Sequence, residues 1–350
     1  KGQKTRYLRM PPIGRKQALL AVTMHRLQCK SCEHIWWPQL SFVKGTKRYT
    51  RAFAHTVLDL LSFGTIKAVA NYLHVSWNLV KNIHKNKLAT VYRRISLANV
   101  RYLGMDAFSI RKNHSYMTIF VDLQTGRILH AVEGRSKQNI SPFLRKVKKR
   151  AKKLKAIAMD MSVSYTSAVN EILPEIPIVF DRYHVMALMN KQIDDLRREL
   201  QRSLNEDGKR YLKGSRYLLL KNYDGVIGND RHRLDILLKA NAPLYEMHTM
   251  KEQLRRFWEH KNEKEALSFL IRWVIDAMFS DISQLRKFSY TLAEHFMGIF
   301  RYYPHKITNG LLEGLNNKIK TMKRQAYGVR DMDYFILRLY DLHSTGYAKK

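Results

Sequence analysis

The expected topology follows from residues 156–184, AIAMDMSVSYTSAVNEILPEIPIVFDRYH. Two short apolar runs, Ala156–Met159 and Ile176–Phe180, each end in an aspartate. The segment Ser162–Leu173 between them can form a helix of about three turns. This pattern predicts strand, helix, strand, with Asp160 and Asp181 at the strand ends, where ligands commonly bind. The structural alternative is that each aspartate caps the following segment or pairs with a nearby basic side chain.

The residues before this stretch predict three more strands. The run YLGMDAFS (102–109) carries Asp106, and the runs 116–123 and 127–133 are joined by a Gln-Thr-Gly hairpin signal. Three sequential strands followed by helix, strand, helix, strand is the order of a ribonuclease-H-like core, an α/β fold with a mixed five-stranded sheet. The first and fourth strands of that core are neighbours. Asp106 and Asp160 should therefore lie side by side.

A third acid comes from much further along the chain. The segment 307–326, ITNGLLEGLNNKIKTMKRQA, predicts a helix in which Glu313 shares one polar face with two asparagines and a lysine. Two glycines, Gly310 and Gly314, each weaken a helix by about 1 kcal/mol, which favours close approach of another backbone or of DNA. Paired carboxylates with oxygen-only ligands suit Mg²⁺ or Mn²⁺. Three acids suffice to hold two such ions for phosphodiester chemistry, and Asp106, Asp160 and Glu313 fit that role.

The composition points to an anionic partner. Lys and Arg number 63 against 29 Asp and Glu, a formal charge of +34. The repulsion between so many positive charges favours binding of a polyanion. Nucleic acid is the leading candidate, because its binding to basic side chains releases counterions. A membrane surface is the alternative, although no apolar run reaches the roughly 18 residues of a spanning helix. Candidate phosphate contacts are Lys148, Lys149 and Lys152 in the basic run 145–155, and Lys320, Lys323 and Arg324 in the later helix. A solvated basic face is the alternative interpretation of the basic run.

Residues 50–92 predict three helices with helix-turn-helix spacing. Ser76 can cap the third helix, which is expected over Trp77–Lys87. Its outward side chains would suit contacts in a DNA groove: Trp77, Asn78, Lys81 and Asn82. The alternative is an ordinary three-helix packing unit.

The chain has only two cysteines, Cys29 and Cys32, which argues against a disulfide-stapled secreted domain and fits a reducing cytoplasm. Their Cys-x-x-Cys spacing is half of a zinc ribbon, and a complete site needs two more ligands. Zn²⁺ is therefore expected only if a second pair precedes Lys1. A thiol pair in a tight turn is the alternative.

These patterns predict four parts. Residues 1–45 form a partial zinc-ribbon-like basic segment, and residues 50–92 a helix-turn-helix DNA-binding domain. The ribonuclease-H-like catalytic domain comprises 100–184 and 305–345, interrupted by a large all-α insertion over 185–304. The tail 326–342 is expected to pack on the sheet.

Four runs together resemble the ISL-three family of bacterial insertion-sequence transposases: GMDAFS (104–109), AMDMSVSY (158–165), VFDRYHV (179–185) and TNGLLEGLNNKIKTMKRQAYG (308–328). The resemblance implies a ribonuclease-H-like Asp-Asp-Glu domain with a helical insertion, in which Asp106, Asp160 and Glu313 hold two Mg²⁺ or Mn²⁺ ions. Two departures are Ala107, where the family often has Glu, and the missing first cysteine pair.

The DRYH run (181–184) is also similar to an Asp/Cys-x-x-His motif found after the second acid in several transposases with such insertions. This makes Asp181 and His184 candidates for orienting the scissile phosphate or a flipped base. Around the third acid the supporting candidates are Asn309, Asn316 and Asn317.

The resemblance implies binding of double-stranded DNA, both the terminal inverted repeats and the target. Metal-dependent cleavage and strand transfer would follow, with a homodimer or larger assembly on DNA. The expected location is the bacterial cytoplasm at the nucleoid, with no membrane partner. A non-catalytic DNA-binding regulator is one alternative, and the presence of all three acids argues against it. A metal-dependent nuclease without strand transfer is the other, and the sequence does not separate it from a transposase.

Overall fold

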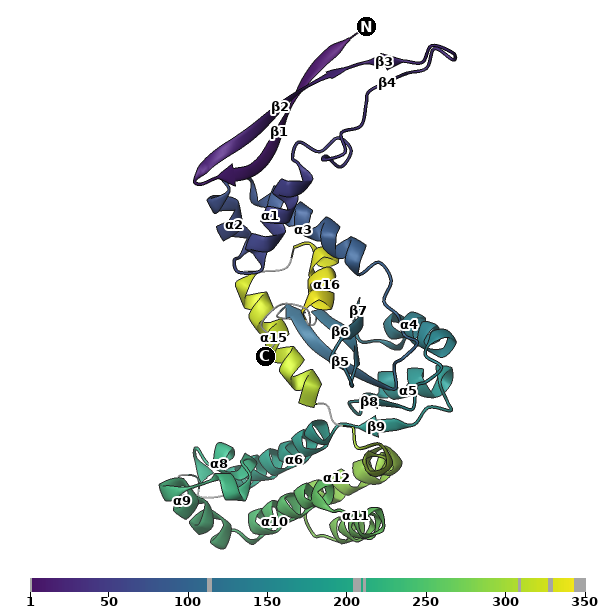
Figure 1. Ribbon diagram of the computed structural model, residues 1–350. Helices are drawn as coiled ribbons and strands as arrows, with labels where there is room; N and C mark the ends of the chain where they lie inside the picture. The colour runs from purple at the N-terminus through teal and green to yellow at the C-terminus, as the bar shows by residue number, and fades with distance from the viewer. Residues whose placement is uncertain are drawn as a thin grey trace. The chain divides into compact units, whose positions relative to one another are not determined.

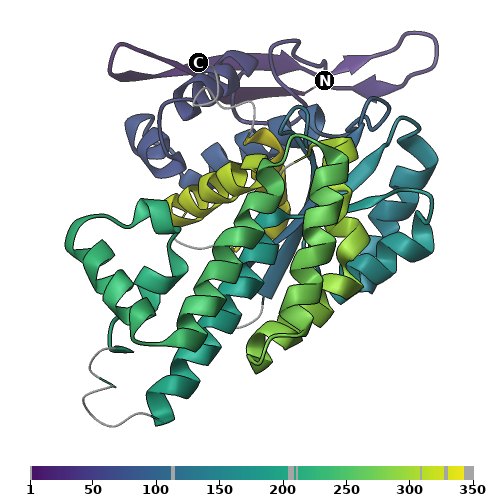
Figure 2. The same ribbon diagram turned by 90° about the horizontal axis from the view of Figure 1, so that it is seen from below.

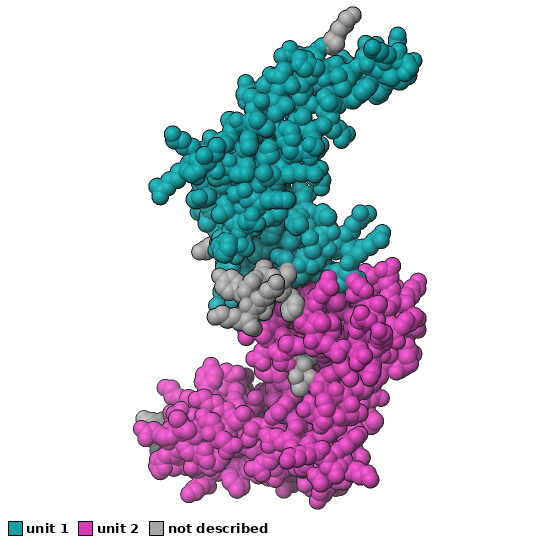
Figure 3. All heavy atoms as spheres, viewed as in Figure 1, with its two compact units in different colours: residues 1–95, 318–350 teal, residues 96–317 magenta. Residues whose placement is uncertain are grey.

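The structure is a computed structural model that describes residues 2–111, 115–203, 209, 212–307, 310–326 and 330–342. It divides into two compact units (Figure 3). Unit 1 comprises residues 1–95 and 318–350, and unit 2 comprises residues 96–317. Within the ranges given, no helix is long and apolar enough to cross a membrane.

Unit 2 is built on a five-stranded sheet with the order β7-β6-β5-β8-β9 (Figure 1). Its strands are β5 (Tyr102–Arg111), β6 (Ser115–Asp122), β7 (Ile128–Glu133), β8 (Ala156–Met159) and β9 (Ile178–Phe180). The first three are antiparallel to one another in sequence order, whereas β8 runs parallel to both β5 and β9. The predicted mixed sheet is confirmed, and so is the pairing of its first and fourth strands.

Two helices of unit 2 pack beside this sheet: α4 (Lys137–Arg150) and α5 (Val163–Ile172). Ser136 caps α4 by accepting a hydrogen bond from the amide of Asn139. Apolar residues recur at helical spacing in α4 and are buried, including Ile140, Phe143 and Leu144. The basic residues of α4 are thereby left on its outer face.

Between β9 and residue 305 the described residues are mostly helical. They are α6 (Arg182–Ser203), α8 (Arg216–Leu220), α9 (Gly228–Lys239), α10 (Ala242–Arg256), α11 (Glu263–Met278), α12 (Ser283–Glu294), α13 (Phe296–Phe300) and α14 (Tyr302–His305), with short 3-10 turns at Tyr223–Gly225 and Phe257–Glu259. Four of them, α6, α10, α11 and α12, lie against one another as a bundle (Figures 1 and 2). A Cβ atom at Gly298 of α13 would lie 2.4 Å from the ring of Phe180, so glycine lets this helical block contact β9 closely.

Helix α15 (Gly310–Gln325) begins in unit 2, where Leu312 is buried. A Cβ atom at Gly104 of β5 would lie 2.6 Å from Cδ2 of Leu123 and 3.1 Å from Cδ1 of Leu312. The absence of a side chain at Gly104 therefore allows α15 to pack on β5 two residues before Asp106.

Unit 1 contains two hairpins and a helical cluster. The long hairpin joins β1 (Gln3–Ile13) to β2 (Lys16–His25), and the short one joins β3 (Leu27–Gln28) to β4 (Ile35–Trp36). The helices are α1 (Arg51–Leu61), α2 (Ile66–Tyr72) and α3 (Trp77–Val91). They share a buried apolar core of Phe53, Val57, Val69, Ala70, Leu73, Val80 and Ile83. All three predicted helices are present, Ser76 caps α3 as expected, and α3 continues four residues beyond Lys87.

Near the end of the chain, α16 (Met332–Asp341) packs against α3 of unit 1. Asp331 accepts hydrogen bonds from Lys81 at 3.2 Å and Lys85 at 2.8 Å. The hydroxyl of Tyr334 lies 2.7 Å from Nδ1 of His84. Within unit 1 the tail helix thus packs on α3, and 318–350 is grouped with this unit. The catalytic segment 305–345 and the packing of the tail 326–342 on the sheet stay predictions. Residues 327–329 lie outside the described residues.

Candidate functional site

Three aspartates lie at one level of the sheet, where β8 and β9 end. Gly104 pairs with Ala158 across β5 and β8, so Asp106 and Asp160 each stand two residues beyond that pair. Met159 pairs with Phe180 across β8 and β9, so Asp160 and Asp181 each follow directly. Parallel pairing in this register therefore sets the backbones of three aspartates from separate segments at one edge of the sheet.

Asp106 and Asp160 line the same hollow of unit 2, which has a volume of about 450 Å³. Arg135 and Tyr116 line it from the antiparallel side of the sheet, and His184 from the start of α6. Nε2 of His184 lies 3.8 Å from Oδ2 of Asp181, so Asp181 can orient this imidazole. The hollow thus combines two acids with a guanidinium and an imidazole, a set suited to a phosphate diester and a cation.

The carboxylate of Asp106 is held on both oxygens. Its Oδ1 accepts a hydrogen bond from the amide of Ala107 at 2.7 Å, and its Oδ2 accepts one from Nδ2 of Asn316 at 2.7 Å. Asn316 lies on α15, one turn after Glu313. Glu313 is exposed, and it is not among the described residues that line the hollow. The structure therefore brings Asn316 to Asp106 and leaves Glu313 one helical turn away on the same face.

The surroundings of Asp160 raise its pKa. Burial raises the pKa of Asp160, and the nearby Asp106 carboxylate adds to this, whereas His184, the Ser162 amide and Arg135 act to lower it. Its Oδ1 accepts a hydrogen bond from the amide of Ser162 at 3.1 Å. Asp181 makes a similar local bond to the amide of Tyr183 at 3.3 Å. Both aspartates therefore also perform the capping role considered as the structural alternative.

The donor set fits a hard divalent cation. Two carboxylates face one hollow, and Oδ1 of Asn316 is buried without a hydrogen-bond partner among the described residues. A carbonyl-type oxygen buried in this way is costly unless a donor or a cation satisfies it. No cluster of three acidic, His or Cys side chains close enough to bind one metal occurs among the described residues. At this hollow, Asp106, Asp160 and Asn316 offer oxygen atoms that could hold a metal.

Three residues of the hollow were not anticipated from the sequence. The guanidinium of Arg135 lies 4.2 Å above the ring of Tyr116, a cation–π contact. The hydroxyl of Tyr165 is buried and lies 2.7 Å from that of Thr118, and burial raises the pKa of Tyr165. Arg135 follows β7 in a Gly-Arg-Ser segment without any recognisable motif. It reaches the hollow because Gly134 bridges back to Met117 of β6.

Comparison with known proteins supplies the family. A family model described as a transposase matches residues 103–339, and a second, described as the helix-turn-helix domain of transposase family ISL3, matches residues 38–85. The chain belongs to the ISL3 family of transposases. The resemblance carried by the four sequence runs is confirmed.

Relatives of the transposase are named for insertion sequences. This chain is 32% identical over 338 residues to the transposase for insertion sequence element IS1001 of Bordetella parapertussis. The match covers 95% of this chain and 83% of that protein. It is 28% identical over 307 residues to the transposase for IS1557 of Mycobacterium tuberculosis, covering 81% of this chain and 69% of that one. The protein is a DNA transposase with a helix-turn-helix domain.

The DNA-contact candidates of the transposase have different surroundings. On α3, Trp77 is 54% exposed, and Asn78 and Asn82 are exposed as well. Lys81 instead pairs with Asp331 at 3.2 Å, and its ammonium lies 5.3 Å from the ring centre of Trp77. The sequence predicted that this lysine faces outward and contacts DNA, and the ion pair with Asp331 adds an intramolecular partner.

The remaining basic candidates are mostly exposed: Lys148, Lys149, Lys152, Lys320 and Arg324. Lys323 is half-buried, and burial lowers its pKa. Asn317 is exposed on α15, and Asn309 lies outside the described residues.

The two cysteines of the transposase occupy the turn of the β3–β4 hairpin. The amide of Cys29 donates to the carbonyl of His34 at 2.8 Å, and its Sγ lies 3.2 Å from Oγ of Ser31. Hydrogen bonds from Ser31 and from the backbone of Cys32 lower the pKa of Cys29 to about 6, which favours the thiolate. No third His, Cys, Asp or Glu side chain lies close enough to Cys29 and Cys32 to share a metal ion with them in the described ranges.

Proposed function

We propose that the transposase cleaves DNA at the ends of its insertion sequence and joins the freed ends to target DNA at the hollow lined by Asp106 and Asp160. The observation that supports this most is the register of β5 and β8, which sets these two carboxylates at one level of the sheet. The hydrogen bond from Asn316 adds α15, the helix that carries Glu313.

Membership of this family fits the use of divalent metal ions. We propose that Asp106, Asp160 and Glu313 hold two ions, either Mg²⁺ or Mn²⁺. When bound, such ions lower the pKa of an attacking hydroxyl and neutralise charge on the leaving oxygen. The unsatisfied Oδ1 of Asn316 supports a cation beside it. Glu313 is the least supported ligand, because its carboxylate is exposed and does not line the hollow.

The other side chains of the hollow bind and orient the substrate. Arg135 can hold a non-bridging phosphate oxygen through its planar guanidinium, with Tyr116 fixing the guanidinium from below. His184 can donate a proton or a hydrogen bond to a phosphate oxygen, and Asp181 orients its ring. Asn316 fixes the rotamer of Asp106. Together they place the scissile phosphodiester between the two acids.

The other parts of the chain serve DNA capture. We propose that Trp77, Asn78 and Asn82 of α3 contact the groove of the terminal inverted repeats. The basic faces of α4 and α15 contact phosphates of the end or of the target. Residues 185–304 form a helical insertion in the catalytic domain, and residues 1–45 form a partial ribbon that binds zinc only with an additional ligand pair. Because two ends must be joined, a homodimer or larger assembly forms on DNA.

The test is cleavage and joining of a labelled duplex that carries the element end, with Mg²⁺ or with EDTA. Wild type should give metal-dependent nicked and joined products. Asp160→Asn and Glu313→Gln should bind the duplex and give no products, whereas Glu175→Gln, an exposed acid before β9, should behave as wild type. Products from Glu313→Gln would remove Glu313 from the ligand set. Nicked products without joining would favour the nuclease, and tight binding without any product would favour the regulator.

A further inference from the structure

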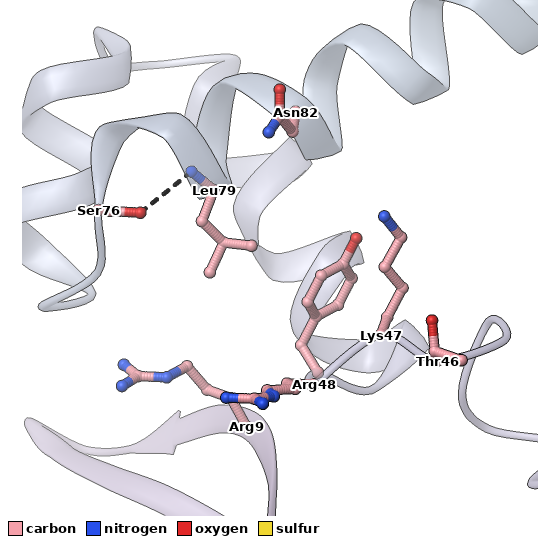
Figure 4. A pocket seen from close by; sticks show the side chains of 8 residues that line it. Arg9, Thr46, Lys47, Arg48, Ser76, Leu79 and Asn82 are labelled. Carbon is pink, nitrogen blue, oxygen red and sulfur yellow. Dashed lines mark hydrogen bonds between the residues drawn. The ribbon is translucent and has the colours of Figure 1, made fainter.

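Unit 1 contains a second hollow, of about 460 Å³, between three segments of the chain (Figure 4). Arg9 lines it from β1, Lys47 and Arg48 line it from the loop before α1, and Asn82 lines it from α3. Sites for small ligands have volumes of roughly 300–1,000 Å³, so the hollow is large enough to receive a group from a ligand.

The charge of this hollow is entirely positive. Three of the lining residues are cationic, and no acid is among the described residues that line it. Lys47 and Arg48 are exposed, and neither has an ion-pair partner within the described ranges. Three cations that face one space repel one another, and an anion between them would remove that cost.

The backbone holds these cations in place. The amide of Arg9 donates to the carbonyl of Arg48 at 3.0 Å, and the amide of Thr50 donates to the carbonyl of Arg9 at 3.0 Å. Nη2 of Arg6 donates to the carbonyl of Lys47 at 2.8 Å. The loop is therefore attached to β1 on both sides of Arg48, which reduces the entropy lost when a ligand binds.

Arg9 also attaches the hairpin to the helix-turn-helix. Its Nη1 donates to the carbonyls of Leu73 at 3.1 Å and His74 at 3.3 Å, at the turn between α2 and α3. His74 has a positive φ of 49°, a conformation in which the helix does not continue. The carbonyls of Leu73 and His74 therefore have no helical partner further along the chain, and they accept these bonds from Arg9. Both bonds use Nη1. They hold the guanidinium of Arg9 in a fixed orientation and leave its other two nitrogens outside these bonds.

We propose that this hollow binds one backbone phosphate of the DNA duplex that α3 contacts. The inference rests on the DNA binding proposed above and names a contact point for it. Asn82 lies on the exposed face of α3 and lines the same hollow, so a duplex that meets this face brings its phosphates to Arg9, Lys47 and Arg48. Phosphate contacts of this kind fix the register of a protein on DNA. Arg9 lies outside the segment 38–85 that matches the helix-turn-helix model, so the β1–β2 hairpin becomes part of the DNA-binding surface.

The first experiment measures the affinity of the full chain for the element-end duplex over a range of salt concentrations. The variant is Lys47→Gln with Arg48→Gln, because both side chains are exposed and the bonds that hold this loop use main-chain atoms of these two residues. Loss of one phosphate contact should reduce the salt slope by about 0.9 and weaken binding about tenfold. The control is Lys239→Gln with Lys264→Gln, which removes the same charge from exposed positions of α9 and α11. Equal losses in the two variants would overturn the inference.

The second experiment identifies the phosphate. Single methylphosphonate groups, which lack the charge, are placed along the end duplex, and each is tested with wild type and with Arg48→Gln. One position should weaken wild-type binding about tenfold and have almost no further effect on the variant. If each methylphosphonate and Arg48→Gln weaken binding additively at every position, the inference is overturned. The proposed function stays intact in that case as long as wild type binds and cleaves normally. Failure of wild type to bind any duplex would overturn both.

Discussion

Nδ2 of Asn316 donates a hydrogen bond to Oδ2 of Asp106 across 2.7 Å, linking residues 210 positions apart in the chain. This contact places the start of α15 against β5 where Asp106 stands. The amide oxygen of the same asparagine is buried without a partner among the described residues. Asn316 thus orients one proposed ligand while offering a second oxygen to the site.

The first prediction concerns this asparagine. Asn316→Ala should lower the cleavage rate or the apparent Mg²⁺ affinity about 10- to 100-fold, the usual effect of removing a group that orients a metal ligand. DNA affinity in EDTA should stay at the wild-type value. The measurement is single-turnover cleavage against Mg²⁺ concentration. Asn170→Ala, an exposed asparagine on α5, is the matched control. An unchanged Mg²⁺ curve for Asn316→Ala would separate Asn316 from the metal.

The second prediction tests the close packing at Gly104. Gly104→Ala should reduce the free energy of unfolding by about 1–3 kcal/mol, because the new Cβ would overlap Leu123 and crowd Leu312. Gly314→Ala is the control on α15, where an added Cβ meets nothing within 4 Å. It should increase stability by up to about 1 kcal/mol through helix propensity. Urea unfolding measures both, and a neutral Gly104→Ala would mean that Leu123 and Leu312 do not pack on Gly104 as closely as described.

The third prediction concerns Arg135. Arg135→Lys should cleave the end duplex more slowly than wild type, because an ammonium does not reproduce the planar fork or its stacking on Tyr116. Tyr116→Leu should produce a smaller loss in the same direction. The rate is measured at saturating DNA. Because Arg135→Lys keeps the positive charge, a lower rate reports the loss of the planar guanidinium and not a general effect of charge. Wild-type rates for Arg135→Lys would show that the guanidinium does not hold the substrate.

The fourth prediction concerns pH. Burial lowers the pKa of His130 to about 4, and the nearby Lys146 adds to this. The unfolded chain, with a histidine pKa of about 6.5, binds this proton more readily than the folded protein. Stability should therefore be fully present above pH 6.5 and fall as the pH drops from about 6.5 to about 4. His130→Phe replaces the imidazole by another aromatic ring that can stack on Phe143, and it removes the titrating group. The stability of this variant should therefore change less with pH between about 6.5 and about 4. Thermal melts at several pH values measure it, with His232→Phe, an exposed site on α9, as control.

The fifth prediction separates structure from DNA contact on α3. Lys81→Met should lower stability by about 1 kcal/mol or less, because it removes the Lys81–Asp331 ion pair. Asp331→Asn should lower it more, because it also removes the ion pair with Lys85. Asn78→Ala should leave the melting temperature unchanged and weaken end binding. If Lys81→Met weakens DNA binding while Asp331→Asn does not, then Lys81 contacts DNA directly, as its position on α3 first suggested.

Local sequence patterns were sufficient for much of this molecule. Alternating and continuous apolar runs gave the five strands, and residues such as Ser76 marked where helices begin. The order of these elements was enough to pair β5 with β8, and hence Asp106 with Asp160, because few topologies accommodate three sequential strands and two crossovers. The family followed from short runs that surround these acids.

Other features came from contacts between segments distant in sequence. The bond from Asn316, the arrival of Arg135 in the hollow, the packing of α16 on α3 and the cluster around Arg9 each join residues that carry no local mark of their partner. Secondary structure reflects the preferences of neighbouring residues and can be deduced from them. The pairing of side chains across a folded unit depends on the register of strands and on the close approach of helices, and these arise only when the whole unit packs.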